Sequence, residues 1–111
     1  MDGRFVFKNA VTRMPEVLLE TLSECDLSLE DVDHFLFHQA NLRINEMVAR
    51  KLQADPAKVH NNIQKTGNTS AATLPILLDQ VVRDGTLQRG QLVTMTGFGS
   101  GFTWGSCVFK Y

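Results

Sequence analysis

The apolar stretch His34-Phe35-Leu36-Phe37 constrains the fold of this chain more than any other part of its sequence. The stretch lacks the alternation of polar and apolar residues that marks a half-exposed strand. A short continuous apolar run suits a strand that is covered on both faces, as in a parallel sheet flanked by helices. We therefore expect an α/β protein with a central sheet.

Helical periodicity surrounds this strand. Apolar residues recur with the spacing of a helix over residues 4–23, 41–53 and 69–84, which predicts three long helices. The segment 28–33 begins with a serine that is followed three positions later by an aspartate. This capping pattern predicts a further short helical turn before the strand. We thus expect three to four helices around the sheet.

The C-terminal part of the chain predicts two further strands. Residues 91–98 and 102–111 read as strands and are joined by the glycine-rich stretch GFGSG at 97–101. Because the connection is short, the two strands should form an antiparallel hairpin. The expected sheet is mixed, has about three strands and belongs to a single domain over residues 1–111.

Composition narrows the classes of function. The chain has 111 residues, of which 43% are hydrophobic and 21% charged, and a formal net charge of −1. Such values are typical of a soluble globular domain and predict neither a nucleic-acid nor a membrane partner. No apolar run approaches the roughly 18 residues of a membrane span, and no signal-peptide pattern precedes the first helix.

The two cysteines, Cys25 and Cys107, suggest a reducing cytoplasm as the compartment. Their spacing fits neither a zinc site nor a redox pair. Cys107 lies in the apolar run of the last strand, which predicts a buried core thiol. Cys25 has no activating neighbour in the sequence.

Three polar or glycine-rich clusters are candidate functional sites. The first, HQAN at 38–41, follows the central strand; the second, TGNTSAAT at 66–73, opens the third helix; the third is GFGSG. In open α/β sheets, reacting groups gather beyond the carboxyl ends of strands, while glycine turns and helix starts offer backbone N–H groups. Each cluster also has an ordinary structural explanation, as a strand end, a polar turn or a hairpin loop.

Taken together, HQANLRI at 38–44, GNTSAAT at 67–73 and GFGSGFTWGS at 97–106 resemble the C-terminal half of β-ketoacyl-acyl-carrier-protein synthase III in order and spacing. The segment MDGRFVFKNAV at 1–11 is similar to the start of the first long helix of that half. This family of condensing enzymes starts type II fatty acid synthesis. The resemblance implies a thiolase-like fold of two similar α/β halves, of which this chain would be the C-terminal one.

The resemblance implies catalytic roles for two residues. The family uses a cysteine, a histidine and an asparagine, and the matching motifs give His38 the role of the histidine and Asn68 that of the asparagine. The nucleophilic cysteine belongs to a motif of the N-terminal half that this sequence lacks. Neither Cys25 nor Cys107 lies in such a motif. Taken alone, the chain should therefore be catalytically inactive.

The implied reaction is a decarboxylative Claisen condensation of an acyl-CoA with malonyl-acyl-carrier protein. His38 and Asn68 would donate hydrogen bonds to the malonyl thioester oxygen as it becomes an enolate. In the turn that contains Phe98, Gly99 and Ser100, a backbone N–H, expected to be that of Ser100, would help to hold the oxyanion formed at the acyl-cysteine. Phe98 would line the mouth of the site and help to exclude water.

Two residues depart from the family's common pattern. Ser100 stands where many members have glycine, and its role survives only if the turn needs no left-handed residue. Phe37 stands where proline commonly precedes the histidine, which should alter the end of the strand slightly.

Other matching positions concern substrates and partners. Gly3 and Asn41 match positions that meet the pantetheine arm of CoA or of the carrier protein. A basic rim would receive the acidic carrier protein, and its residues are Arg43, Arg50, Lys51 and Lys8. The resemblance also implies a homodimer for the full enzyme and a cytoplasmic, bacterial or plastid-type location. No metal or cofactor is expected besides the substrates.

Two alternatives to this function stay open. A related acyltransferase or a condensing enzyme of specialised metabolism would use the same histidine and asparagine on other acyl chains. A non-catalytic module that binds an acyl carrier protein would use the basic rim alone.

Overall fold

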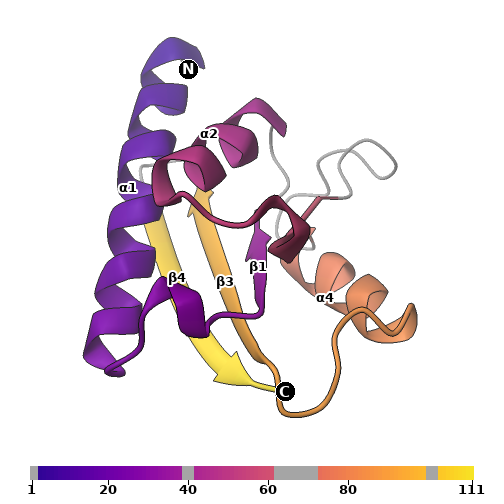
Figure 1. Cartoon of the computed structure of the whole chain (residues 1–111). Helices are drawn as coiled ribbons and strands as arrows, with labels where there is room; N and C mark the ends of the chain where they lie inside the picture. Colours follow the sequence, from indigo (N-terminus) through magenta and orange to yellow (C-terminus); the bar gives the residue numbers. More distant parts are fainter. Residues whose placement is uncertain (1–2, 39–41, 62–72, 100–102) are drawn as a thin grey trace.

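The computed structural model describes residues 3–38, 42–61, 73–99 and 103–111. Within these ranges the chain forms long helices, short 3-10 turns at Leu29–Asp31 and Pro56–Lys58, and strands (Figure 1). The long helices are α1 (Gly3–Glu24), α2 (Leu42–Leu52) and α4 (Thr73–Arg83), and the strands are β1 (His34–Phe37), β2 (Val59–His60), β3 (Leu92–Gly99) and β4 (Thr103–Lys110).

The strands form one mixed sheet in the order β2-β1-β3-β4. Strand β1 is parallel to both of its neighbours, whereas β3 and β4 pair antiparallel from Leu92 opposite Lys110 to Gly99 opposite Thr103. The α/β class, the parallel central strand and the C-terminal hairpin are thereby confirmed. The sheet has one strand more than the expected three, because the two residues of β2 are too few to show a periodic pattern.

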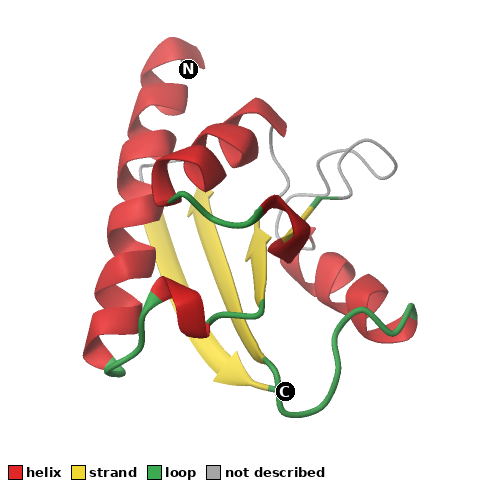
Figure 2. Ribbon diagram, viewed as in Figure 1, coloured by secondary structure: helices red, strands yellow, loops and turns green. Residues whose placement is uncertain are grey.

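Strand β1 is buried on both faces, as its uninterrupted apolar run predicts. Successive side chains of a strand point to opposite sides of the sheet. Phe35 and Phe37 therefore belong to the hydrophobic cluster beneath α1 and α2, whereas Leu36 belongs to the cluster beneath α4. The helices thus cover the two faces of the sheet separately (Figure 2).

The larger core lies between the sheet and the two N-terminal helices. Met14 and Leu18 of α1 and Val48 of α2 are almost completely shielded from solvent in this cluster. Each such side chain contributes about 1.5–3 kcal/mol through the removal of its apolar surface from water. This core positions α1 and α2 on the same face of β1 and β3.

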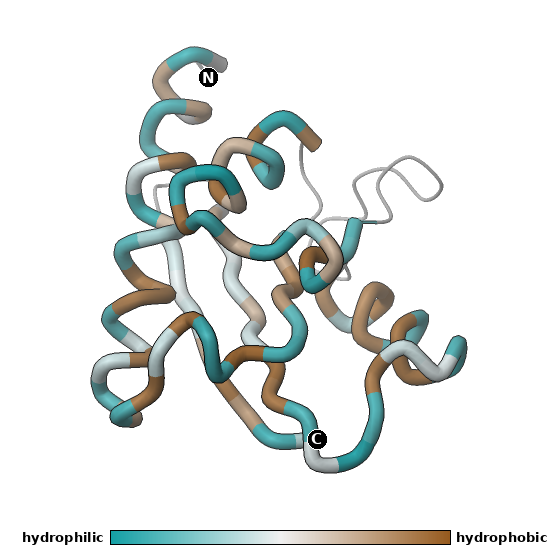
Figure 3. The backbone as a smooth tube through the Cα atoms, in the orientation of Figure 1, coloured by the Kyte–Doolittle hydropathy of each residue, from teal (hydrophilic) through white to brown (hydrophobic). Residues whose placement is uncertain are grey.

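The smaller core lies under α4, which carries a long hydrophobic stretch (Figure 3). Leu77 and Val81 of this helix pack with Leu36 and Val93 of the sheet. Gly85 follows the helix with a φ of 79°, in the left-handed conformation that suits a helix end.

Cys107 corrects one expectation, because its side chain is exposed rather than buried in a core. The residue lies opposite Met95, on the α4 face of the edge strand β4. Helix α4 packs over β1, which is two strands away from β4 in the sheet. The apolar residues next to Cys107 in the sequence therefore did not predict its burial correctly. Burial of a strand residue depends on whether another element of the chain packs over that part of the sheet.

None of the helices within the described ranges has the length and apolar character that a membrane crossing requires.

Candidate functional site

His38 follows the last residue of β1 at the carboxyl edge of the parallel strands. Its backbone N–H donates to the carbonyl oxygen of Thr96 in β3 at 2.9 Å, which extends the β1–β3 pairing by one step. The arrowheads of β1 and β3 lie at the same end of the sheet, close to α2 (Figure 1). The expected position of His38 beyond a strand end is therefore confirmed.

Gly97 lies where two predicted motifs and the first turn of α4 meet. A β-carbon added to this glycine would lie 3.7 Å from Cβ of His38 and 3.7 Å from Cδ1 of Leu74. Leu74 belongs to the first turn of α4, directly after the segment 62–72 that contains Asn68. The strand-end histidine, the glycine-rich end of β3 and the start of α4 are thus brought together by the fold. A side chain at Gly97 would occupy the space between them.

The imidazole of His38 is half-buried in this position. Burial lowers the pKa of His38 below its usual value, because desolvation penalises the charged ring. At neutral pH the ring is therefore neutral, with one N–H donor and one acceptor nitrogen. Such a group suits the donation of a hydrogen bond to a developing negative charge better than it suits strong general-base catalysis.

Phe98 leaves β3 on the face opposite to the would-be side chain of Gly97. Its ring stacks on Trp104 of β4 with 6.0 Å between the ring centroids, and it packs against the core beneath α1 and α2. The guanidinium carbon of Arg13 lies 5.6 Å from the centroid of the Trp104 ring. The role of Phe98 at the mouth of the site stays a prediction.

Several predicted site residues lie at or beyond the limits of the described chain. Gly3 is the first residue of α1, and Gly99 is the last residue of β3. Asn41, Asn68 and Ser100 lie outside the described residues. Their roles stay predictions from the motifs.

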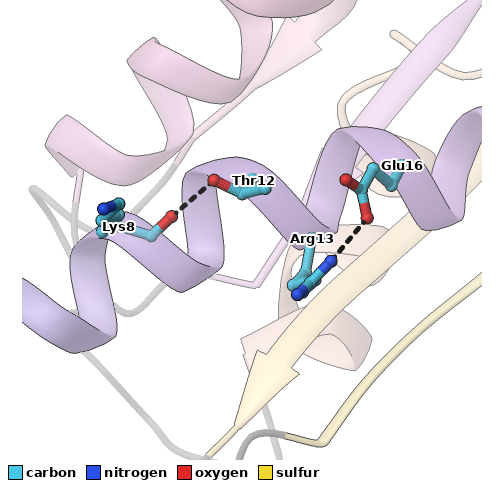
Figure 4. A network of polar contacts seen from close by, with 4 residues as sticks. All are labelled: Lys8, Thr12, Arg13 and Glu16. Atoms are coloured by element: carbon cyan, nitrogen blue, oxygen red, sulfur yellow. Dashed lines mark hydrogen bonds and ion pairs between the residues drawn. The ribbon is translucent and has the colours of Figure 1, made fainter.

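The four residues of the basic rim are all exposed, three on α2 and Lys8 on α1. The guanidinium carbon of Arg43 lies 5.6 Å from the ring centroid of Phe7, so that it sits against the turn of α1 that carries Lys8. Further along α1, Arg13 is paired with Glu16 at 3.0 Å, which concentrates the positive charge toward the Lys8 end of the helix (Figure 4). The expectation that α1 and α2 share a cationic surface is consistent with this geometry.

A groove borders the basic rim at Arg50. It has a volume of about 490 Å³ and lies between α2 and β2. Its apolar lining comes from Ala49, Ala54, Pro56 and Val59. Glu46 also lines the groove, so its charge is mixed rather than cationic.

Asn45 is a buried polar residue that the periodicity of α2 did not single out. It is fully shielded from solvent, and its Nδ2 donates to Oδ1 of Asn61 at 3.0 Å. Asn61 is the last residue before the segment that carries Asn68, so this bond fastens α2 to the base of that segment. The Oδ1 atom of Asn45 is buried and meets no donor among the described residues. An asparagine between Ile44 and Val48 on the apolar side of the helix was the signal in the sequence.

The described residues contain no group of three or more His, Cys, Asp or Glu side chains placed to hold a metal ion.

Comparison with known proteins identifies relatives of this chain. Residues 22–111 match the family described as 3-oxoacyl-[acyl-carrier-protein (ACP)] synthase III C terminal. The chain is also 41% identical over 111 residues to β-ketoacyl-[acyl-carrier-protein] synthase III from Microcystis aeruginosa, and covers 33% of that protein.

Solved structures give the same result. The crystal structure of 3-oxoacyl-[acyl-carrier-protein] synthase III from Aquifex aeolicus matches with a TM-score of 0.98 and 45% identity, over 100% of this chain and 36% of that one. The priming β-ketosynthase from the R1128 polyketide biosynthetic pathway matches with a TM-score of 0.94 and 34% identity, over 99% of this chain and 33% of that one. The chain therefore spans about a third of the length of these relatives.

Proposed function

The chain belongs to the family of C-terminal domains of 3-oxoacyl-[acyl-carrier-protein] synthase III, and from this premise we propose that it supplies the histidine and asparagine of a condensing enzyme. The enzyme joins an acyl group from acyl-CoA to malonyl-acyl-carrier protein and so initiates fatty acid synthesis. A cysteine thiolate from the remaining part of the enzyme first receives the acyl group as a thioester and releases CoA. The present chain acts in the second half of the reaction.

In that half-reaction, the bond between the malonyl carboxylate and the α-carbon breaks and carbon dioxide leaves. The electron pair of the bond moves into the thioester and places negative charge on its oxygen as an enolate. His38 and Asn68 donate hydrogen bonds to this oxygen, and each preorganised donor contributes roughly 3–4 kcal/mol to the transition state. The α-carbon then attacks the acyl-cysteine carbonyl, and the thiolate departs from the tetrahedral intermediate.

The observation that carries this proposal is the meeting of three elements at Gly97. His38 and Leu74 both lie 3.7 Å from the place of its missing β-carbon. A neutral, half-buried imidazole and the start of the helix that follows the Asn68 segment therefore border the same small space. A β-carbon at position 97 would be in ordinary van der Waals contact with both side chains, so a larger side chain there would extend between them.

The remaining residues of the motifs serve binding and charge stabilisation. The backbone N–H of Ser100, the residue that follows Phe98 and Gly99 at the end of β3, stabilises the oxyanion of the acyl-cysteine. Gly3 and Asn41 contact the pantetheine arm, and the basic rim receives the carrier protein. The reaction needs no resident metal or cofactor.

A second candidate is a condensing enzyme of specialised metabolism, favoured by the match to the R1128 priming β-ketosynthase. The two functions use the same donors and differ in the acyl chain that is accepted. Product analysis with acetyl-CoA and longer acyl-CoAs separates them.

The test uses a chimera in which this chain replaces the corresponding C-terminal part of the Aquifex aeolicus synthase III, which is 45% identical to it. The chimera should condense acetyl-CoA with malonyl-acyl-carrier protein. The changes His38→Ala and Asn68→Ala should each lower kcat on the order of 10²–10³-fold, because each removes a donor to the enolate. His60→Gln, which alters a histidine elsewhere in the sheet, is the control at pH 8. A His38→Ala chimera as active as its parent would refute the proposal.

A further inference from the structure

A second histidine site lies at the opposite end of β1 from His38. Nδ1 of His34, the first residue of β1, lies 2.8 Å from Nε2 of His60 in the neighbouring strand β2. The ring centroids are 5.0 Å apart, and His34 is only 8% exposed. Two rings at this distance share one hydrogen bond, so a single hydrogen lies between the facing nitrogens.

Gln91 determines which nitrogens carry hydrogens. The backbone N–H of Gln88 donates to Oε1 of Gln91 at 2.8 Å, and this fixes the oxygen of the amide rather than its nitrogen in that place. The same oxygen lies 2.8 Å from Nε2 of His34. Because an amide oxygen only accepts, Nε2 of His34 must carry a hydrogen.

The neutral state of the pair follows from this assignment. A neutral His34 with hydrogen on Nε2 has a lone pair on Nδ1, so Nε2 of His60 must donate to it. One added proton is accommodated on either ring, because the other ring still offers a lone pair to the shared hydrogen bond. Two added protons leave both facing nitrogens with hydrogens, and the bond becomes a repulsive contact between cations.

We propose that His34 and His60 form a proton-operated latch that stays closed with no added proton or with one, and opens when the second proton binds. The latch joins β1, β2 and the turn before β3. Gln91 also accepts from the backbone N–H of the C-terminal Tyr111 at 2.9 Å. Opening therefore loosens the edge of the sheet and the connection between α4 and β3.

The charged surroundings of the latch permit this behaviour. Asp84, which follows α4, is the described acid that acts on His60 through its charge. Asp33 before β1 accepts from the backbone N–H of Leu92 at 2.8 Å, and Lys58 before β2 donates to the carbonyl oxygen of Val32 at 2.8 Å. Among the described residues of α4, of the connection 84–91 and of β4, the other charged side chains are Asp79, Arg83, Arg89 and Lys110, and all four are exposed.

Burial supports the direction of the pH response. Desolvation lowers the pKa of His60, a charged His34 lowers it further, and Asp84 raises it in part. The unfolded chain has a histidine pKa of about 6.5 and binds two protons at these residues well below that pH. The closed latch binds at most one, so unfolding takes up protons in acid. Its stabilisation is complete above pH ~6.5 and is lost as the pH falls below that value.

The first measurement is the tautomeric state of the histidines in the full 111-residue chain, by ¹⁵N NMR of the imidazole rings at pH 8. Both His34 and His60 should carry hydrogen on Nε2. Hydrogen on Nδ1 of His34 would overturn the proposal. This test uses the unaltered protein and does not depend on any variant that folds.

The second measurement is urea unfolding at constant ionic strength between pH 8 and pH 5, for the parent chain and for His60→Gln. The glutamine amide donates to His34 at high pH and turns its oxygen toward a protonated His34 at low pH, so the conflict disappears. For each pH unit by which the pH is lowered below 6, the unfolding equilibrium constant of the parent should rise at least about tenfold more than that of the variant. This difference corresponds to one more proton taken up when the parent unfolds. Equal slopes would overturn the proposal. His38 is present in both proteins, so its titration cancels.

Discussion

Phe37 and His38 are neighbours whose side chains serve opposite faces of the sheet. Phe37 is completely buried beneath α1 and α2 and stacks with Phe35, with 6.3 Å between the ring centroids. His38 comes next in the chain and borders Gly97 on the other side. Because the side chains of a strand alternate, the burial of Phe37 decides the direction in which His38 points. A packing residue thus orients a proposed catalytic one.

Phe37→Ala should lower the free energy of unfolding by about 3–5 kcal/mol, because it leaves a cavity in the core. Phe5, on α1, is 54% exposed, and Phe5→Ala is the matched control. The control should change the free energy of unfolding by no more than about 0.5 kcal/mol. Urea unfolding followed by circular dichroism measures both values. If Phe37→Ala shows no cooperative unfolding transition, its destabilisation is taken as larger than that of Phe5→Ala. Equal destabilisation by the two changes would contradict the role given to Phe37.

Side chains on different faces of helix α2 make three different kinds of contact. Val48 and Leu52 face the core, Asn45 binds Asn61 at the base of the segment that carries Asn68, and Arg43 lies over Phe7 of α1. Arg50 and Lys51 occupy its last turn, where positive charge also complements the negative end of the helix dipole. One helix therefore connects the proposed docking surface to the proposed reaction site.

Arg43→Glu should weaken the binding of an acyl carrier protein roughly tenfold at low salt, because a favourable charge contact becomes a repulsive one. The loss should shrink as salt rises and screens both contacts. Titration calorimetry of the chain with the carrier protein at two salt concentrations measures the effect.

Arg89→Glu is the control for the same change of net charge, since Arg89 lies 4.4 Å from the ring centroid of Tyr111 near the C-terminus, far along the chain from α2. Binding that is insensitive to Arg43→Glu, or that is weakened equally by Arg89→Glu, would argue against docking on α2. Binding by the isolated chain without any condensation activity in the chimera would favour a carrier-binding module instead.

Within the part of the chain that the structure describes, helices cover the two faces of the sheet unequally. Helices α1 and α2 extend over β1, β3 and β4 on one face, whereas α4 covers the β1 side of the other. On the α4 face, Cys107 of β4 is exposed, and on the α1 face Trp104 of the same strand is 42% exposed. Because the thiols of Cys25 and Cys107 are both exposed, the reactivity of each toward an acyl-CoA can be measured directly.

The isolated chain should form no stable thioester when it is incubated with acetyl-CoA, because neither cysteine lies in the family's nucleophile motif. Intact-protein mass spectrometry measures the adduct. Treatment with iodoacetamide is the positive control and should label both exposed cysteines. An acetyl adduct that Cys107→Ser abolishes would show that Cys107 is a nucleophile after all.

Local patterns predicted most of the secondary structure. The strand expected at 34–37 is β1 without any change of bounds, and the helix expected at 4–23 is α1 at Gly3–Glu24. Both rest on patterns within a single segment, where burial on two faces or on one stripe leaves a clear periodicity. The apolar run at 34–37 also predicted that His38 follows a strand, and the family resemblance added the thiolase-like fold and the proposed role of His38.

Long-range features were beyond these patterns. The exposure of Cys107 depends on which strand lies at the edge of the sheet and on which strand α4 covers. The contact between His34 and His60 depends on the parallel pairing of β1 with a strand of only two residues. The sequence of neither strand shows which other strand it pairs with, so the contact between His34 and His60 becomes visible only in the folded sheet.

The topology of the sheet also has a consequence for the order of folding. The antiparallel pairing of β3 with β4 joins residues that are close in the sequence, whereas the parallel pairing of β1 with β3 joins residues far apart in it. Closing the longer loop costs more chain entropy and slows the step that needs it. We expect the hairpin to form early and β1 to dock late. His38 would then reach its place beside Gly97 only in a late stage of folding.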